Sequence, residues 1–241
     1  MPVRPDSLGA TAPAAREARK KKAASAPRHR VQRTKARARY DRDSIHAILD
    51  AGLIAHVGFV THGQPFVIPM LYARVGDALL LHGSIASRLV NALGGGIPAC
   101  VSMTLVDGLV LARSHFHHSV NYRSVVAFGM AKLVSDRDEK VAALAHFVDA
   151  IVPGRTSESR PPDRNELAAT HVLRFEIDDA SAKVRTGSVK DDAADVALPY
   201  WAGVVPQRAT YGAPIADDSV AHGTEPPLSV QRLIAANGAR T

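Results

Sequence analysis

The feature that most constrains the fold is a run of six short, β-rich segments between Leu53 and Val134, separated by turn residues and interrupted by a single helical stretch. The segments cover residues 53–60, 66–75, 78–82, 99–105, 109–115 and 123–134. Short loops such as residues 61–65 join antiparallel neighbours, whereas parallel strands need long crossovers. The pair Asp107-Gly108 lies between two apolar runs and predicts a hairpin turn. We therefore expect a mainly β protein with flanking helices, built on a six-stranded antiparallel barrel.

Helical stretches flank the β-rich run. Residues 44–52 follow Asp41 and Asp43, either of which can cap a helix. Residues 137–152 carry apolar side chains at helical spacing, and we expect this face to be buried: Val141, Leu144, Ala145, Val148 and Ile151. Residues 171–184 alternate in polarity and predict a last strand.

Charge is distributed unevenly along the chain. The first 42 residues carry thirteen Lys or Arg against three acidic residues, a net +10; the remainder carries 17 against 20, a net −3, which gives the +7 of the whole chain. Residues 1–39 also contain few large apolar side chains, so they predict a disordered basic tail. Such a tail either contacts nucleic acid or anionic lipid through phosphates or is simply solvated. We expect a domain over residues 40–206 and an irregular C-terminal tail over residues 207–241.

Several classes of protein and site are disfavoured. No apolar run reaches the roughly 18 residues of a membrane span, and the N-terminus has no apolar signal core, so we expect a soluble, cytoplasmic protein with no membrane contact. Motifs for phosphate-binding loops, dinucleotide folds and hydrolase nucleophiles are missing. The single Cys100 cannot form an internal disulfide. The histidines near His115 lack a Cys or acidic partner to complete a metal site, so no metal is expected.

A ligand site is expected in the stretch from His82 to Gly129, where polar residues gather at the ends of apolar runs. Residues 85–93 read as a helix capped by Ser84, and Ser87 and Arg88 lie in its first turn. A helix N-terminus offers free amides and a positive dipole end, so this turn suits an anion. The alternative is that the serine only caps the helix and the arginine is only solvated.

The order of motifs resembles the pyridoxamine 5′-phosphate oxidase-like family, in its flavin-nucleotide-binding branch near the nitroimidazole-resistance reductases. The resemblance covers residues 37–206 and rests on GFVTHGQPFVIPMLY, LLLHGS, SR at a helix start, DGLVLARS, NYRSVVAFGMAKLV, EKVAAL and PGR. It implies a split β-barrel homodimer that binds FMN at the subunit interface.

The resemblance also implies site residues. Ser84, Ser87 and Arg88 would bind the flavin phosphate, with Asn121 and Arg123 as further partners. The other implied flavin contacts are the strand residues Val67, Ile68, Pro69, Met70 and Tyr72, the strand end His82 and Gly83, and Ser124. The chain departs from the oxidase at Leu89, where the family has Lys, and at Val67 and Tyr72, which replace Arg and Lys.

These features together suggest an FMN-dependent oxidoreductase acting on a small molecule, with the flavin as hydride or electron carrier. His82 is the expected catalytic proton donor. One alternative is a flavin- or haem-binding storage or sensor protein without turnover. Another is a nucleic-acid-binding protein that acts through its tail.

Overall fold

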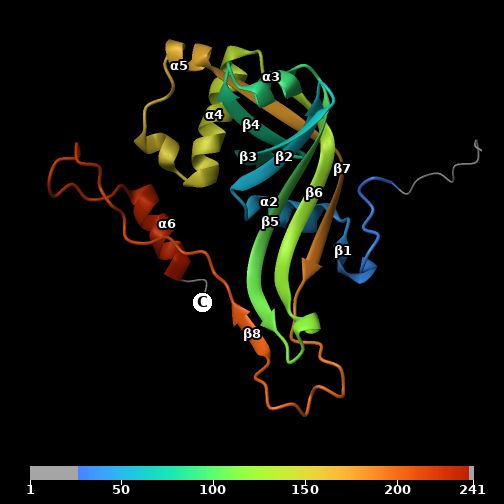
Figure 1. The fold of residues 1–241 in the computed structure, drawn as a ribbon. Coiled ribbons are helices and arrows are strands. Elements are labelled where there is room, and N and C mark those ends of the chain that lie inside the picture. Colours follow the sequence, from blue (N-terminus) through green and yellow to red (C-terminus); the bar gives the residue numbers. More distant parts are fainter. Residues whose placement is uncertain (1–26, 239–241) are drawn as a thin grey trace, which may run out of the picture.

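The structure, a computed structural model, describes residues 27–238 and contains within them one antiparallel sheet of eight strands. Six of the strands form a barrel: β2 (Ile54–Thr61), β3 (Gln64–Val75), β4 (Ala78–Ser84), β5 (Pro98–Leu111), β6 (Ser119–Leu133) and β7 (Thr170–Arg185). They pair in the order β7-β4-β3-β2-β5-β6, and β6 pairs with β7 to close the ring (Figure 1). The predicted six-stranded antiparallel barrel is confirmed.

Two barrel strands are long enough to have two partners along one edge. β7 pairs with β4 through residues 170–176 and, nearer its end, with β1 (Ala38–Arg39). β5 pairs with β2 through residues 99–102 and with β8 (Gly203–Pro206) through residues 108–111. The sheet is therefore a split rather than a regular barrel, because these two strands extend beyond the ring.

The pair Asp107-Gly108 does not form the predicted turn. β5 runs through it with a shift of register just before Gly108. A side chain at Gly108 would place its Cβ 2.8 Å from the carbonyl oxygen of Val205, so a glycine lets the backbone of β8 pass. The predicted strands over 99–105 and 109–115 are thus largely one strand, and β7 is the sixth strand of the barrel.

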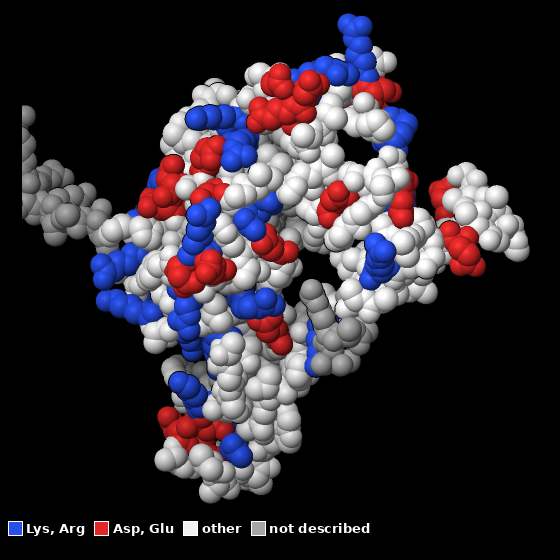
Figure 2. Space-filling view, turned by 180° about the vertical axis from the view of Figure 1, so that it is seen from behind, with Lys and Arg blue, Asp and Glu red and all other residues white. Residues whose placement is uncertain are grey.

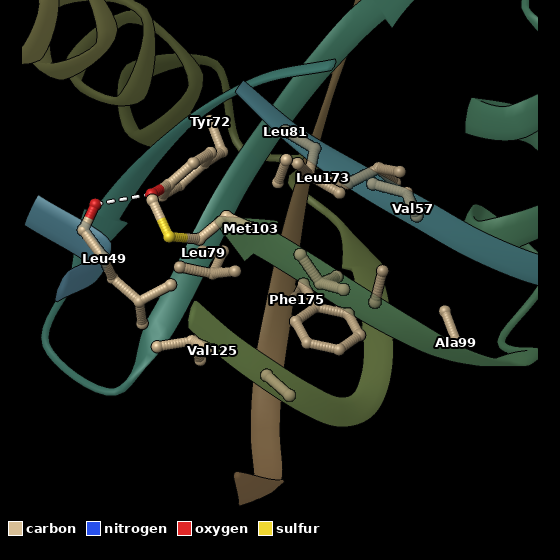
Figure 3. Packing of buried hydrophobic residues seen from close by; sticks show 14 of the residues in the cluster. Leu49, Val57, Tyr72, Leu79, Leu81, Ala99, Met103, Val125, Leu173 and Phe175 are labelled. Atoms are coloured by element: carbon tan, nitrogen blue, oxygen red, sulfur yellow. Dashed lines mark hydrogen bonds between the residues drawn. The ribbon is translucent and has the colours of Figure 1, made fainter. Parts of the chain in front are cut away.

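The barrel core contains most of the large buried side chains. Phe175 and Leu173 on β7 meet Leu79 and Leu81 on β4 inside the ring (Figure 3). Tyr72 on β3 is also in this core, and its hydroxyl donates a 2.5 Å hydrogen bond to the carbonyl of Leu49. The alternation along these strands directs every second side chain inward.

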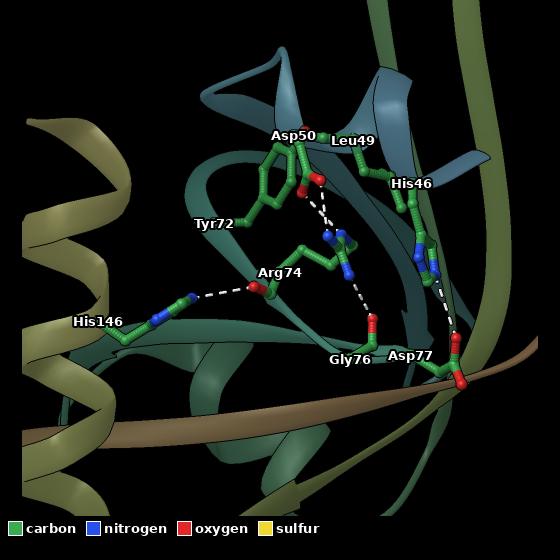
Figure 4. A network of polar contacts seen from close by, with 8 residues as sticks. All are labelled: His46, Leu49, Asp50, Tyr72, Arg74, Gly76, Asp77 and His146. Carbon is green, nitrogen blue, oxygen red and sulfur yellow. Dashed lines mark hydrogen bonds and ion pairs between the residues drawn. The ribbon is translucent and has the colours of Figure 1, made fainter. Parts of the chain in front are cut away.

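The helix α2 (Arg42–Asp50) covers one end of the barrel and begins where the sequence predicts. Its N-cap is Asp41, whose carboxylate accepts a 2.8 Å hydrogen bond from the amide of Ser44. Its last residue, Asp50, is bound by Arg74 of β3 (Figure 4). Its apolar face is buried against the barrel: Ile45, Ile48 and Leu49.

The helix α3 (Arg88–Gly94) begins three residues later than the predicted helix over 85–93. Ser87, not Ser84, is its N-cap. The Ser84 hydroxyl instead accepts a 3.2 Å hydrogen bond from the amide of Ala86, and the Ser84 carbonyl accepts a 2.9 Å hydrogen bond from the amide of Ser87. The chain thus completes a turn after β4 before the helix starts.

A helical layer lies outside the barrel against β3, β4 and β7 (Figure 1). It consists of α4 (Arg137–Ile151), η4 (Arg155–Glu158) and α5 (Arg164–Ala169). α4 buries Ala143 and Phe147 in a second apolar cluster with the outer-face residues Leu80 and Val172. The face that the sequence predicts as buried is only half-buried, because a different pair of side chains contacts the barrel.

Residues 27–39 differ from the disordered tail that the sequence predicts. After η2 (Lys35–Arg37), β1 adds to the free edge that β7 presents beyond β4, and Arg28 donates a 3.1 Å hydrogen bond to Asp179. This edge explains the order, because unpaired strand groups favour an added strand. The rest of the predicted tail, residues 1–26, lies outside the described residues.

The C-terminal part combines irregular chain with β8 and α6 (Leu228–Gly238), so the predicted irregular tail over 207–241 contains a helix. The amide of Ser229 donates a 3.2 Å hydrogen bond to the carboxylate of Glu158, and its hydroxyl donates a second one. α6 is therefore attached to η4.

Basic and acidic side chains are interspersed on the face shown in Figure 2. Ion pairs of the described residues include Arg42 with Asp77 at 2.6 Å and Arg123 with Asp107 at 2.7 Å. No helix between residues 27 and 238 is both long and apolar enough to cross a membrane.

Candidate functional site

A first cavity lies between the β2–β3 hairpin and α3. Its volume is about 480 Å³, and it is lined by Thr61, His62, Gln64, Phe66, Arg88, Asn91 and Ala92. The hairpin tip, His62-Gly63, has positive φ at both residues, as a tight two-residue turn requires. This turn places the polar end of the hairpin beside the first turn of α3.

Arg88 is the main charged group of this first cavity. Its guanidinium carbon lies 4.9 Å from the centre of the Phe66 ring. Within residues 27–238 it has no hydrogen-bond or ion-pair partner. Arginines in folded proteins usually bind carboxylates or phosphates. An unpaired guanidinium in a cavity is thus available to an anionic ligand.

Three of the residues expected to bind phosphate lie together at this end of the barrel. Ser84, Ser87 and Arg88 fall within the single turn between β4 and α3. The side-chain amide of Asn91 donates a 3.0 Å hydrogen bond to the carbonyl of Ile85 and so holds this turn. α3 has only seven residues, so the dipole at its N-terminus is weak. The charge of the Arg88 side chain is therefore the main attraction for an anion.

Gly83 leads into this turn and allows β4 to approach α3 closely. A Cβ at this position would lie 2.9 Å from a methyl carbon of Val90. The predicted flavin contact at Gly83 is thus placed beside the turn, where any larger residue would push the helix away.

The predicted flavin-contacting residues of β3 divide between two faces. Val67 is 67% exposed, and Pro69 is exposed on the same outer face. Ile68 and Met70 pack toward the core, and Tyr72 is buried with its hydroxyl bonded as described above. Burial raises the pKa of Tyr72. Within one chain, the outer pair is the most exposed part of this set.

The predicted β6 residues are not brought to the first cavity. Asn121, Arg123 and Ser124 lie near the start of β6, and α3 lies at the other end of the barrel (Figure 1). Arg123 is bound to Asp107 at 2.7 and 3.0 Å, and the Ser124 hydroxyl donates a 3.3 Å hydrogen bond to the carbonyl of Lys183. Within one chain, the predicted site residues therefore lie in two separate parts of the fold.

Arg185 is a buried cation, whereas the sequence alone leaves open whether it serves a substrate or lies on the surface. Its side chain is 6% exposed and donates a hydrogen bond to the side-chain oxygen of Asn121, while its Nε has no partner. Burial is the main reason that its pKa is lowered. No carboxylate within residues 27–238 forms an ion pair with it. The pattern at this strand end, VRTG, gives no signal of burial.

A second cavity lies between the outer face of the barrel and the helical layer. Its volume is about 850 Å³. One wall is the apolar face of α4, formed by Val141, Leu144, Ala145, Val148 and Ile151. The other lining residues are Leu71, His82, Phe147, Thr156, Ser159, Arg160, Pro161, Pro162, Glu166 and Thr170. The half-buried face of α4 therefore borders this cavity.

His82 faces the second cavity and not the first. It points from β4 to the outer face, where its ring packs edge-on against Phe147 with 4.5 Å between ring centres. Its Nδ1 is buried and has no hydrogen-bond partner within residues 27–238. Burial lowers the pKa of His82 and so favours the neutral imidazole. The predicted proton donor, His82, and the predicted phosphate-binding residue, Arg88, thus line different cavities.

One ion pair lies in the lining of the second cavity. The guanidinium of Arg160 binds the carboxylate of Glu166 through two hydrogen bonds of 2.7 and 2.8 Å. This contact lowers the pKa of Glu166 to about 2. The cavity therefore combines an apolar wall with one charged pair.

The histidine cluster near the start of β6 does not form a metal centre. His115 and His117 lie in η3 (His115–His117), and His117 pairs with Asp192 at 3.2 Å. Among residues 27–238, no group of three or more His, Cys, Asp or Glu side chains is arranged to hold a metal ion.

Comparisons with known proteins agree with this architecture. Residues 41–184 match the sequence model of the family described as pyridoxamine 5′-phosphate oxidase. No curated protein sequence matches the chain. Among solved structures, the FAD and haem binding protein from Mycobacterium smegmatis is 41% identical, with a TM-score of 0.79, and the match covers 82% of this chain and 97% of that one.

Two further solved structures extend the comparison. The flavocytochrome Anf3 from Azotobacter vinelandii is also 41% identical, with a TM-score of 0.79 and coverage of 84% of this chain and 94% of that one. A protein from Bacteroides thetaiotaomicron assigned to 5-nitroimidazole antibiotic resistance is 22% identical, with a TM-score of 0.52, covers 61% and 86%, and shares the fold. The matched family model spans more than half of the chain and agrees with the motif order, so this protein belongs to the pyridoxamine 5′-phosphate oxidase family.

Proposed function

We propose that the protein binds a flavin nucleotide at the first cavity and acts as an oxidoreductase on a small molecule. The observation that carries this proposal is the unpaired guanidinium of Arg88 in a cavity beside the strand that the family resemblance assigns to the flavin. Two 41% identical structures, one named as FAD and haem binding and the other as a flavocytochrome, support the same cofactor class.

The residues of the first cavity suit a phosphate-bearing ligand. Arg88 would bind a phosphate through charge-assisted hydrogen bonds, and the Ser84 hydroxyl lies within the same turn. The exposed outer face at Val67 and Pro69 offers an apolar surface for a ring system. When bound, a flavin supplies hydride or electron transfer, and the protein supplies position and electrostatics.

The identity of the flavin is the finer part of the proposal. The resemblance of the sequence implies FMN, while one of the 41% identical structures is a protein that binds FAD. Both nucleotides carry phosphate, so Arg88 fits either one. We retain FMN as the expectation and treat FAD as the competing result.

A homodimer is also part of the proposal. The group near the start of β6, Asn121, Arg123 and Ser124, lies far from Arg88 within one chain. A second copy would be able to bring its own β6 group to the flavin, as an interface site requires. Exposed apolar residues on the barrel strands, such as Val67 and Val60 at 67% and 58%, support such a contact.

A second candidate function is haem binding, alone or together with flavin. The second cavity favours it, because His82 presents an imidazole without a hydrogen-bond partner for its Nδ1 to a space of about 850 Å³. The name of the M. smegmatis protein supports the same pair of cofactors. In this case His82 would not be a proton donor for the flavin.

The test is to purify the protein and identify what it carries. A visible spectrum with flavin bands, followed by mass spectrometry of the heat-released cofactor, is expected to give FMN. Release of FAD would keep flavin binding and reject FMN. A colourless protein that takes up neither nucleotide would reject the flavin proposal, whereas a Soret band would support the haem proposal separately.

A further inference from the structure

A basic segment is fixed to the side of the barrel where β1 pairs with β7. Residues 27–42 contain seven Lys or Arg and one Asp, and six of the seven cations are arginines. Arg28 is bound to Asp179, and its guanidinium carbon lies 5.1 Å from the centre of the Phe128 ring on β6. The ring of His29 lies 3.2 Å from the same carboxylate. The segment is therefore anchored near its start by these contacts and near its end by β1.

The chain between the two anchors follows a defined path beside β7 (Figure 1). The amide of Val31 donates a 3.0 Å hydrogen bond to the hydroxyl of Tyr40, and the amide of Arg37 donates one of the same length to the carbonyl of Thr34. Thr34 has a φ of 57°, which is uncommon for a residue with a side chain and persists only where the surrounding structure holds it. The cations of the segment are thus presented in a fixed arrangement.

Most of these cations have no acidic partner. Arg42 is bound to Asp77, and Arg28 contacts both Asp178 and Asp179. Asp41, the acidic residue within the segment, caps α2. Within residues 27–238 the other five cations form no ion pair. Four of them are exposed and Arg37 is half-buried, and we call the five the basic strip: Arg30, Arg33, Lys35, Arg37 and Arg39.

Positive charge continues from the basic strip onto β7. Lys183 lies directly opposite Ala38 where β1 pairs with β7, and it forms no ion pair within the described residues. Arg185 is buried two residues further on, and burial, followed by the like charge of Arg37, lowers its pKa. Folding therefore gathers cations around β1 without an anion among them. Their mutual repulsion opposes folding, and an anionic partner would offset it.

The residue types indicate which anion fits. Arginine presents a planar fork of donors that matches two phosphate oxygens, so it is preferred wherever phosphate is bound. The strip extends over residues 30–39 and lines neither of the two cavities described above, so it suits a row of phosphates rather than one small anion. Val31 is the single large apolar side chain of residues 27–39, which leaves little to insert into a lipid surface.

We propose that the basic strip binds the phosphate backbone of nucleic acid without reading its sequence. Contacts between cations and phosphates supply essentially all of non-specific binding to nucleic acid. Sequence is read in the grooves by a helix or a β-ribbon, whereas η2 and β1 have only three and two residues. The inference is independent of the proposed function, because no residue of the strip lines a cofactor cavity.

The test is a fluorescence anisotropy titration of a short DNA duplex with the full chain, repeated from about 50 to 200 mM salt. The strip variant Arg33→Gln, Lys35→Gln, Arg37→Gln removes three charges and keeps Arg39, whose guanidinium binds two nearby backbone carbonyls. We expect it to bind roughly tenfold or more weakly than wild type. The slope of log affinity against log salt should become shallower by about 2.7, because each lost phosphate contact reduces it by about 0.9.

Two matched variants each remove three charges elsewhere. One substitutes glutamine for the lysine run at residues 20–22, which precedes the described residues. The other substitutes exposed arginines outside the strip: Arg137→Gln, Arg164→Gln and Arg208→Gln. The arginine control should bind DNA nearly as wild type does, and wild type should bind two duplexes of unrelated sequence equally. Thermal melts and flavin content of every variant report on folding.

The outcomes separate the strip from simple net charge. An unchanged affinity and salt slope in the strip variant would overturn the proposal, as would an equal loss in the arginine control. A loss confined to the lysine variant would move the binding site to the preceding chain and overturn the strip. If the strip variant does not fold, the double variant Arg33→Gln, Lys35→Gln replaces it, and its slope should be shallower by about 1.8.

A second titration decides between nucleic acid and lipid. Vesicles of phosphatidylserine and phosphatidylcholine take the place of the duplex, with the same set of variants. Binding to these vesicles without binding to DNA would overturn the assignment to nucleic acid. DNA binding that is lost with the strip charges would support it, whatever the flavin content of the protein.

Discussion

The guanidinium of Arg74 makes two hydrogen bonds, each 2.6 Å long, to the carboxylate of Asp50, and so fastens the last residue of α2 to β3 (Figure 4). The same side chain donates a 2.8 Å hydrogen bond to the carbonyl of Gly76 in the β3–β4 turn. The backbone carbonyl of Arg74 also lies 2.9 Å from the ring Nε2 of His146 on α4. One residue thus connects two helices to the barrel.

This arrangement predicts a measurable coupling between Arg74 and Asp50. Hydrogen bonds to charged groups contribute about 1.5 to 3 kcal/mol, and partial exposure of Asp50 reduces this to about 1 kcal/mol. A double-mutant cycle of Arg74→Ala and Asp50→Ala, followed by denaturant unfolding, measures the coupling. The matched control is the exposed pair Arg137 and Asp138, 3.5 Å apart, for which we expect almost none. Equal values for the two cycles would contradict the prediction.

A second prediction concerns flavin affinity. Arg88→Ala removes an exposed guanidinium that has no hydrogen-bond or ion-pair partner within residues 27–238 and contacts only the Phe66 ring, so stability without flavin should change little. If the arginine binds phosphate, the variant should bind flavin roughly tenfold to hundredfold more weakly, because a charged hydrogen bond of about 1.5 to 3 kcal/mol is lost. Flavin titration of the protein without cofactor measures this.

The control for Arg88 is Arg164→Ala. Arg164 is also the first residue of a short helix, α5, but it lies outside the first cavity. The flavin affinity of Arg88→Lys should lie between those of wild type and Arg88→Ala, since lysine keeps the charge but cannot form a bidentate contact. The same flavin affinity in all of these proteins would place the phosphate elsewhere.

A third prediction concerns Gly129, at the register shift where β6 meets β7. A Cβ at this position would lie 1.8 Å from the carbonyl oxygen of Glu176 and 3.1 Å from the Phe175 ring. Gly129→Ala should therefore destabilise the fold by at least the upper end of the about 1 to 3 kcal/mol typical of overpacking. Gly212→Ala, where a Cβ meets nothing within 4 Å, should be nearly neutral in the same melts. A mild effect at Gly129 would mean that β7 can move away.

A fourth prediction uses the ion pair between Glu166 and Arg160. The contact lowers the pKa of Glu166 from 4.5 to about 2. A carboxyl group with a lowered folded-state pKa stabilises the fold fully above its unfolded pKa, and that stability is lost as the pH falls through the folded pKa. Wild type should thus melt at a higher temperature than Glu166→Gln at pH 7, and the difference should shrink as the pH falls from about 5 toward 2.

The control for this pH series is Glu225→Gln, which changes an exposed loop residue. Its melting temperature should follow that of wild type at every pH. A Glu166→Gln difference that stays constant down to pH 2 would mean that the ion pair does not contribute in solution.

The sequence was sufficient where the determinants of structure are local. The cap at Asp41 and the hairpin of β2 and β3 depend on neighbouring residues, and both are found as predicted. Asp107-Gly108 is different, because the same pair of residues between two apolar runs can form either a hairpin turn or an irregularity within one strand. Here the backbone of β8, near Val205, makes the glycine necessary, and that segment lies almost a hundred residues further along the chain.

The candidate site could be predicted only in part for the same reason. Ser87 and Arg88 are neighbours in the chain, so their proximity follows from the sequence. Alternation along β4 puts His82 on the face opposite Leu81, but it does not reveal that α4 leaves a cavity there. The apolar spacing along α4 predicts a buried face, and this prediction is wrong in part, because periodicity cannot distinguish a face that contacts protein from one that borders a cavity.

The short strands β1 and β8 have a consequence for solubility. Each covers an edge that a long barrel strand would otherwise leave open, β1 on β7 and β8 on β5. Open strand edges are templates on which other chains can pair and aggregate. β1 precedes the six barrel strands in the sequence and β8 follows them, so a shortened protein that keeps the six strands but lacks either segment would expose an unpaired strand edge. We expect such a protein to self-associate through that edge more readily than the full chain.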